Sequence, residues 1–174
     1  MDIREVKTKR AIYNAFIELR SENPLEAIKI KDLAAKAEIS KATFYLHYRD
    51  IYDLSEQLQK NLIHEIFSCI SDPAVFFTSS KQSFYELERA FMDHLTEVRV
   101  LFSGSQEFLL AAMIEREIKD AIYKIRPELK NDLRTNVRLS YRVFGAFCSY
   151  SENMKRFDSA RVSEELVGLL DSYE

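Results

Sequence analysis

The residues with the most distinctive chemistry lie in a nine-residue stretch, Ser40 to Tyr48. Its side chains combine a positive charge for a phosphate, hydroxyl groups that donate hydrogen bonds, and a small residue that permits close approach. Lys41 supplies the positive charge, Thr43, Tyr45 and Tyr48 supply the hydroxyl groups, and Ala42 is the small residue. The combination suits a helix that contacts a nucleic acid.

The spacing around this stretch predicts two short helices joined by a tight turn. Ser40 is a suitable N-cap for the second helix, because its hydroxyl can accept from backbone N–H groups near Thr43. The first begins at Ile30, and three residues, 38–40, separate the two. This is the spacing of a helix-turn-helix unit, whose second helix enters the major groove. A pair of surface helices in a bundle, with His47 as an exposed imidazole and the tyrosines half-buried, explains the spacing equally well.

Charge is distributed unevenly along the chain. The net charge at pH 7 is −3, but residues 1–49 carry +3 and residues 50–174 carry −6. A polyanion responds to local positive charge more than to the total, so the N-terminal segment favours nucleic acid. Ordinary scatter explains a charge of +3 over 49 residues equally well.

The helices that must position these residues follow from apolar spacing. The chain has only three glycines and three prolines, too few for a turn-rich β fold. Residues repeating at i, i+3, i+4 and i+7 predict an all-α protein of about nine helices. The expected helices are 5–22, 30–37, 40–48, 50–70, 84–98, 114–125, 128–155 and 159–172, the last with Tyr173 on its apolar face, and residues 73–80 are expected to be a loop.

Several classes of protein are not expected. The longest apolar run, Phe108 to Ile114, has seven residues, against about 20 for a membrane span. Cys69 and Cys148 lack a C-x-x-C spacing, and two cysteines in such a chain indicate free thiols in a reducing compartment, which predicts a cytoplasmic protein. No enzyme signature, such as a Gly-rich phosphate loop, G-x-S-x-G or H-E-x-x-H, is present. No enzyme activity, cofactor, metal site or membrane partner is expected.

At the level of motifs, Thr8 to Leu54 resemble the N-terminal domain of the TetR family of transcriptional regulators. The matching segments read I-Y-N-A-F-I-E-L, I-K-D-L-A-A-K-A, I-S-K-A-T-F-Y-L-H-Y and D-I-Y-D-L. The T-F-Y-x-H-Y core is the most specific of them. The resemblance implies a three-helix DNA-binding domain over residues 1–49 and a helical effector-binding and dimerisation domain over 50–174.

The resemblance also implies which residues contact DNA. By position, the family's recognition helix contributes Lys41, Ala42, Thr43, Tyr45 and His47. Tyr45 and His47 are expected chiefly on phosphates. The start of the preceding helix, at Lys29 and Lys31, is expected near the DNA backbone.

The chain departs from the family pattern in three ways. Glu38 stands where a glycine is usual in the turn, which costs strain if the position needs a positive φ. Ile51 replaces a lysine that usually contacts a phosphate, a contact that is lost unless Arg49 supplies it. Ile28 and Lys29 replace the usual Ser or Thr cap of the second helix.

The remaining two thirds of the chain match no sharp motif. By analogy with the family, the last two long helices pair with their copies in a second subunit, and the apolar residues on two sides of the 132–152 helix predict the same independently. The predicted interface consists of Val137, Tyr141, Phe144, Gly145, Cys148, Ser149, Val162, Leu166, Leu169 and Leu170. Burial inside one subunit is the alternative. The candidate lining of a pocket for an unknown small-molecule effector consists of Phe84, Phe91, His94, Phe108, Met113, Tyr123 and Tyr141, although such residues are more often plain core.

These observations predict a homodimeric, ligand-responsive transcription factor that binds a palindromic double-stranded operator, most often as a repressor. The competing hypothesis is a helical dimer that works through protein contacts, with weakened or lost DNA binding.

Overall fold

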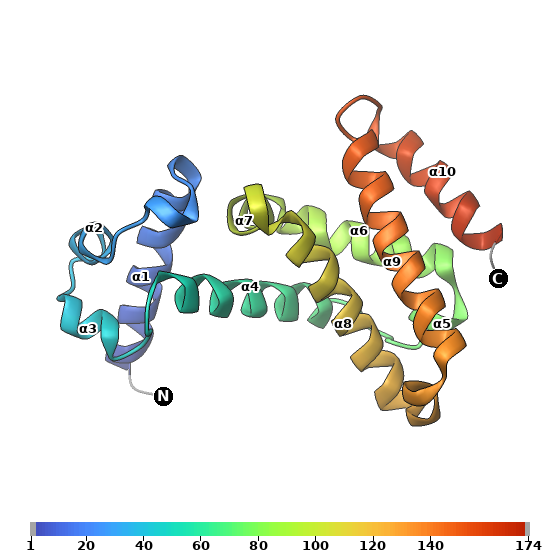
Figure 1. Cartoon of the computed structure of the whole chain (residues 1–174), viewed down its shortest axis with the longest axis horizontal. Helices are drawn as coiled ribbons and strands as arrows, with labels where there is room; N and C mark the ends of the chain where they lie inside the picture. Colours follow the sequence, from blue (N-terminus) through green and yellow to red (C-terminus); the bar gives the residue numbers. More distant parts are fainter. Residues whose placement is uncertain (1–2, 173–174) are drawn as a thin grey trace. The chain divides into compact units, whose positions relative to one another are not determined.

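The computed structural model describes residues 3–172, so Tyr173 lies outside the described residues. Within that range the chain is all-α, as predicted, and has no strand. The ten α-helices are α1 Ile3–Glu22, α2 Ile30–Lys36, α3 Lys41–Tyr45, α4 Ile51–Ser68, α5 Val75–Thr78, α6 Ser80–Asp93, α7 Leu95–Leu101, α8 Glu107–Ile125, α9 Leu133–Asn153 and α10 Ser159–Ser172 (Figure 1). Short 3₁₀ turns occupy Leu25–Ala27, Gly104–Gln106 and Pro127–Asn131.

Two predicted elements were wrong. The expected loop at 73–80 contains α5, because Val75 and Phe76 are buried in a hydrophobic cluster and Asp72 accepts a hydrogen bond from the backbone N–H of Ala74. The expected single helix over 84–98 is divided into α6 and α7 at His94, whose φ of −115° and ψ of 19° leave the helical region. Apolar spacing continues across this break, so the sequence pattern did not reveal it.

The helices pack into two compact units. Unit 1 comprises the described residues up to Leu62 together with Leu95–Gln106, and unit 2 comprises Ile63–His94 and the described residues from Glu107 onward. Helix α4 therefore contributes its first twelve residues to unit 1 and its remainder to unit 2. The functional boundary predicted between residues 49 and 50 stays a prediction.

Unit 1 is built around α1. This helix packs on α2 and α7, and α2 packs on α3. Its core side chains are completely or almost completely buried. Burying one large apolar side chain contributes about 1.5–3 kcal/mol to the free energy of unfolding. Those with 0% exposure are Ile12, Phe16, Leu33, Phe44 and Leu54.

The end of α7 is held to α1 and α4 by two buried polar side chains. Arg20, which is 7% exposed, donates from Nη1 to the carbonyl of Asn23 at 2.9 Å and from Nη2 to the carbonyl of Ser103 at 3.1 Å. Gln59, which is 2% exposed, donates from Nε2 to the carbonyl of Leu101 at 2.8 Å. Carbonyls at a helix C-terminus have no partner within the helix, so these two side chains satisfy groups that would otherwise be unpaired.

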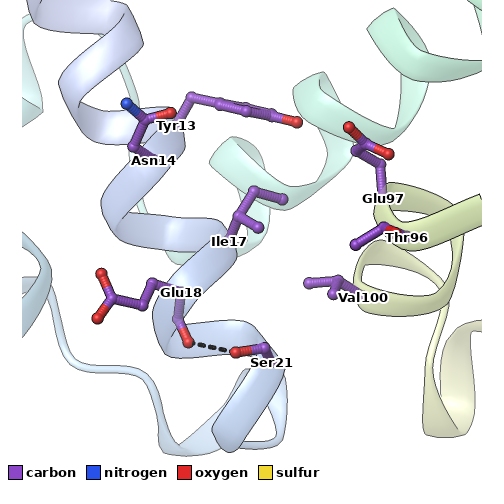
Figure 2. A pocket seen from close by; sticks show the side chains of 8 residues that line it. All are labelled: Tyr13, Asn14, Ile17, Glu18, Ser21, Thr96, Glu97 and Val100. Atoms are coloured by element: carbon purple, nitrogen blue, oxygen red, sulfur yellow. Dashed lines mark hydrogen bonds between the residues drawn. The ribbon is translucent and has the colours of Figure 1, made fainter. Parts of the chain in front are cut away.

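A groove of about 410 Å³ lies between α1 and α7, within unit 1. Figure 2 shows Ile17 of α1 opposite Val100 of α7, with polar side chains around them. None of the seven residues predicted to line an effector pocket lines this groove.

The turn between α2 and α3 is a Schellman motif. The N–H of Ile39 donates to the carbonyl of Ala34 at 3.0 Å, and the N–H of Glu38 donates to the carbonyl of Ala35 at 3.2 Å. Glu38 has a φ of +54°, in the left-handed region that favours glycine. The condition under which the sequence predicted strain at this position is therefore met.

Glu38→Gly is expected to raise the free energy of unfolding by about 1 kcal/mol, because relief of the left-handed strain exceeds the extra chain entropy of glycine. Urea titration followed by circular dichroism measures this change. Glu38→Ala is the matched control, since it removes the same carboxylate and keeps a Cβ. A gain that is equal in the two variants would show that charge, rather than the backbone, limits stability here.

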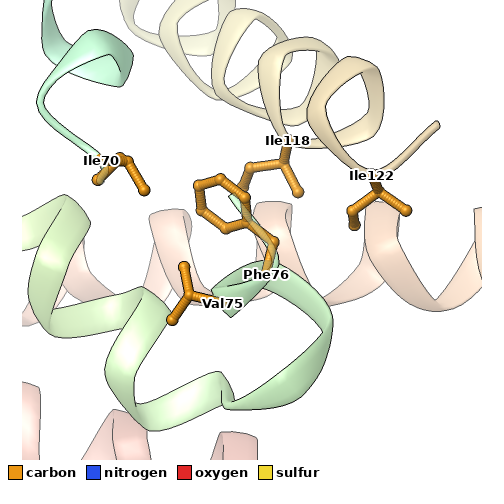
Figure 3. Close-up of a cluster of buried hydrophobic side chains, with 5 residues drawn as sticks. All are labelled: Ile70, Val75, Phe76, Ile118 and Ile122. Carbon is orange, nitrogen blue, oxygen red and sulfur yellow. The ribbon is translucent and has the colours of Figure 1, made fainter. Parts of the chain in front are cut away.

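Unit 2 has its own core around α5 and α8. Figure 3 shows the buried cluster of Ile70, Val75, Phe76, Ile118 and Ile122. Helix α8 packs on α9, and α10 packs on both α6 and α9. Helices α9 and α10 are neighbours joined by a short turn (Figure 1).

Three polar side chains tie α6, α9 and α10 together inside unit 2. Glu88 Oε1 accepts from the Tyr150 hydroxyl at 3.0 Å and from the Ser163 hydroxyl at 2.5 Å. Burial, together with the hydrogen bond to the Glu88 carboxylate, raises the pKa of Tyr150 to about 12. The neutral phenol is therefore the form that the folded protein favours.

This shifted pKa predicts a loss of stability at high pH. An unfolded tyrosine ionises near pH 10, so the unfolded state releases a proton between about pH 10 and 12 that the folded state still holds. The stabilisation is complete below pH 10 and is lost as the pH rises towards 12. Tyr150→Phe is expected to flatten this part of a plot of unfolding free energy against pH, whereas the exposed control Tyr52→Phe is not. An unchanged slope in Tyr150→Phe would contradict the assignment.

Candidate nucleic-acid interface

Helix α3 is anchored at its start and on its inner side. Ser40 is its N-cap, as predicted, and its Oγ accepts from the N–H of Thr43 at 3.0 Å. The hydroxyls of Ser40 and Thr43 also lie 2.8 Å apart and share a hydrogen bond. Phe44 points inward with 0% exposure, so one side of the helix belongs to the core of unit 1.

The outer side of α3 carries several of the predicted contact residues. Lys41, Ala42 and Tyr45 are exposed, with Tyr45 57% exposed, and His47 is half-buried just beyond the helix. Tyr48 is different, because it is only 7% exposed and its ring lies 5.7 Å from that of Phe44. Burial raises the pKa of the Tyr48 phenol. The structure therefore makes Tyr48 a packing residue.

Leu46 and Arg49 are exposed beside these residues. Leu46 has no role in the sequence prediction, yet it is 82% exposed, the highest value among the large hydrophobic residues of the described chain. Its exposure could have been predicted from its place directly after Tyr45, on an outward-facing turn. The Arg49 side chain is 83% exposed and lies 3.4 Å from Asp53.

The start of α4 explains one of the departures from the family pattern, Ile51. Ile51 is 5% exposed and so serves as a core residue of unit 1. Asp50 caps the helix by accepting from the N–H of Asp53 at 2.8 Å. The N–H of Arg49 donates to the Asp53 carboxylate and holds its pKa below the usual range. Arg49, which is exposed, is the cation nearest in sequence to position 51, where the family usually has a lysine.

Three of the predicted cations lie on the surface of unit 1. Lys29, Lys31 and Lys41 are exposed and make no ion pair with the residues that the structure describes. Lys29 occupies the N-cap position of α2, where no side chain caps the helix. Lys36, by contrast, is paired with Glu18 at 2.5 Å. Unpaired exposed ammonium groups remain available to an external anion such as a phosphate.

The residues of the predicted dimer interface differ in their exposure. Val162 and Leu166 are buried inside unit 2, at 7% and 6% exposure, so they are packing residues of the protomer and not surface residues. Phe144 and Leu170 are half-buried. The exposed members are Val137, Tyr141, Gly145, Cys148, Ser149 and Leu169. Helix α9 has no buried residue at all, although its sequence is apolar on two sides.

The predicted effector-pocket residues do not converge on one cavity that the structure shows. Phe108 and Tyr141 are exposed, at 73% and 68%. Tyr123 packs against the core cluster of unit 2, and its hydroxyl donates to Asn136 at 2.6 Å. The other four, Phe84, Phe91, His94 and Met113, are half-buried.

Two general features of the described chain bear on other classes of function. No helix within residues 3–172 is both long enough and apolar enough to cross a bilayer. The same residues contain no cluster of three or more His, Cys, Asp or Glu side chains that could hold a metal ion. Cys69 and Cys148 are both free and exposed.

Comparison with known proteins identifies the fold. No protein-family model matches the chain, and no curated protein matches it. Among solved structures, it is similar to the dihydroxyacetone kinase operon activator DhaS, with 20% identity over 95% of each chain and a TM-score of 0.62. It is also similar to a Clostridium perfringens protein described as a fatty acid metabolism regulator, with 20% identity over 92% of this chain and 97% of that one and a TM-score of 0.42. The first likeness shows that this chain shares the fold of the operon activator.

Proposed function

We propose that this protein is a DNA-binding transcriptional regulator of the TetR family that uses α3 as its recognition helix. The observation that carries the proposal is the two-sided character of α3, in which Phe44 is completely buried while Lys41, Ala42 and Tyr45 face outward. A helix of five residues is not stable alone. A buried anchor is therefore what keeps its polar side presented in one orientation.

The cations around α3 suit the backbone of a duplex. Lys41 lies at the start of α3, and Lys29 and Lys31 lie at the start of α2, all exposed. Phosphate contacts position a protein on DNA, whereas contacts to base edges read sequence. The proposal therefore assigns positioning to the lysines and reading to the outer side of α3, including Thr43, Tyr45 and His47.

Dimerisation through α9 and α10 is part of the proposal. The side chains of Val137, Tyr141 and Leu169 are exposed at 59%, 68% and 55%, and Gly145 has open space around it. A second copy of the same helices would bury this apolar surface in a four-helix interface. Two recognition helices about 34 Å apart can then read two half-sites of a palindrome.

Effector control completes the proposal. An effector that binds one arrangement of the dimer more tightly than another shifts the population towards it, and so lowers or raises the affinity for DNA. The coupling is reciprocal, so DNA must change effector affinity by the same factor. Repression by occupying a promoter is the expected output, since most members of the family act in this way.

A salt series tests DNA binding directly. Duplexes selected from random sequence by the purified protein would be titrated at several salt concentrations. Each phosphate contact adds about 0.9 to the slope of log affinity against log salt. Changing Lys29, Lys31 and Lys41 together to alanine is expected to reduce the slope by about 2 to 3 per protomer.

The matched control neutralises three exposed lysines of unit 2, at positions 81, 124 and 130. It is expected to leave the slope nearly unchanged. A flat series in the unaltered protein would favour the alternative hypothesis, a helical dimer acting through protein contacts. The burial of Ile51, which removes a usual phosphate contact, is the observation that keeps this alternative open.

A further inference from the structure

The side of α3 that lies opposite its buried anchor is apolar. Leu46 follows the last residue of α3, and its N–H donates to the carbonyl of Ala42 at 3.2 Å, so it continues the helical hydrogen bonding. Residues four apart in a helix lie on the same face. Phe44, which is 0% exposed, is two residues from each of them and so lies on the roughly opposite side. Ala42 and Leu46, both exposed, form the apolar ridge of α3 that lies farthest from the core of unit 1.

Polar side chains flank the apolar ridge on both sides. Lys41 and Tyr45, four residues apart, are exposed along one side. Thr43 and His47, also four residues apart, are half-buried along the other. The ring of Tyr45 lies edge-on to that of Phe44, with 5.6 Å between the centroids, so part of it packs on the core. The apolar ridge is therefore the centre of the outward face, and the polar groups form its edges.

The charge around the apolar ridge favours duplex DNA as its partner. Lys29, Lys31 and Lys41 are exposed around it, and their charge is complementary to the phosphates that border a groove. When a helix enters the major groove, its outermost side chains meet the edges of the bases. Side chains on its flanks lie closer to the phosphates. The apolar ridge is thus the part of α3 that would meet the bases.

One kind of base presents an apolar group to such a ridge. In the major groove thymine presents its C5-methyl group, whereas the edges of guanine, adenine and cytosine present hydrogen-bond donors and acceptors. Leucine cannot replace the hydrogen bonds that water makes to those polar edges, so covering them costs affinity, while covering a methyl group gains it. Four residues of helix span about 6 Å and a base pair about 3.4 Å, so the ridge reaches about two base pairs.

We propose that the apolar ridge recognises the methyl groups of thymine at one or two adjacent base pairs in each half-site, and that Leu46 contributes most of this discrimination. The inference rests on the proposed function, because it requires α3 to enter the major groove. It states which base the DNA site must contain, and it adds Leu46 to the residues that determine specificity. The small side chain of Ala42 permits the close approach that this contact needs.

Deoxyuridine tests the contact, because it differs from thymidine only in lacking the C5-methyl group. The duplex is the site that the full-length protein selects from random sequence, and each thymine is replaced in turn in both half-sites. Fluorescence anisotropy at one fixed salt concentration measures the affinity. Replacement at one or two adjacent positions is expected to weaken binding roughly fourfold per methyl group, the value for removing one buried methyl group. Replacement elsewhere is expected to have no effect.

Leu46→Ala identifies the side chain that makes the contact. Because Leu46 is 82% exposed, the variant is expected to fold as the unaltered protein does, which circular dichroism checks. It should bind the selected duplex more weakly, and replacing the sensitive thymines should now weaken its binding less than about twofold. Leu133→Ala is the matched control, since Leu133 is 77% exposed in unit 2. It should keep the full effect of deoxyuridine.

The possible results separate this inference from the proposed function. Salt-dependent binding that is equal for every deoxyuridine duplex would overturn the thymine contact and leave the regulator assignment intact. A deoxyuridine effect of the same size in Leu46→Ala would assign the methyl contact to another side chain and overturn the role of Leu46. A full-length protein that binds no duplex would overturn both proposals and would indicate a protein partner for the apolar ridge.

Discussion

Phe44→Ala is expected to lower the free energy of unfolding by about 3–5 kcal/mol, the largest effect of any substitution discussed for this protein. Phe44 is 0% exposed and is the one residue of α3 that is fully inside the core. Removing its ring leaves a cavity, and a five-residue helix has no other large anchor. Urea titration of the full chain, followed by circular dichroism, measures the loss.

The neighbouring residue provides the matched control. Tyr45→Ala removes an aromatic ring of similar size from the same helix, but that ring is 57% exposed, so the expected loss is within about 0.5 kcal/mol. Under the proposed function, both variants are expected to bind DNA more weakly when binding is measured under conditions where both are folded. Phe44→Ala would lose affinity through disorder of α3, and Tyr45→Ala through loss of the proposed contact. Equal stability losses would contradict the anchoring role of Phe44.

Arg20→Ala is expected to lower the free energy of unfolding by about 3 kcal/mol. The substitution leaves the carbonyls of Asn23 and Ser103 without their donors and removes a buried side-chain stem. The Nε atom of Arg20 has no hydrogen-bond partner among the described residues, so burying the guanidinium has a cost. This cost offsets part of the stability that its two hydrogen bonds contribute. Hydrogen exchange should show faster exchange at the C-terminal end of α7.

Arg10→Ala is the matched control, because Arg10 lies on the same helix and is exposed. Its expected effect is within about 0.5 kcal/mol. Gln59→Leu gives an independent measurement of how strongly the end of α7 is held, since it removes the hydrogen bond to the Leu101 carbonyl with little change in side-chain volume. If Arg20→Ala were as stable as the control, the desolvation of the guanidinium would fully balance its hydrogen bonds, and Arg20 would not hold α7 in place.

Local features of the chain were predictable from the sequence. Ser40 was identified as an N-cap, and the structure confirms it. The all-α class was also predicted correctly, because apolar periodicity and scarce glycine and proline are properties of short stretches of chain. The strain at Glu38 was predicted on one condition, a positive φ at the position where the family usually has glycine, and the φ of +54° meets that condition.

Features that depend on residues distant in sequence were not predictable. The helical turn at α5 forms because Val75 and Phe76 meet Ile118 and Ile122, more than 40 residues away. The same holds for the burial of Tyr48, Val162 and Leu166, since an apolar or aromatic residue on a helix has the same pattern whether it faces its own core or a partner.

The helical class, the Ser40 cap and the order of side chains along the outer side of α3 follow from contacts within a few residues, so they could be predicted without the structure. Tertiary packing, in contrast, sets which tyrosines are exposed, places Arg20 and Gln59 against the end of α7, and forms the groove between α1 and α7. The physical reason is that burial and long-range hydrogen bonds depend on how helices pack, and many packings are compatible with one apolar periodicity.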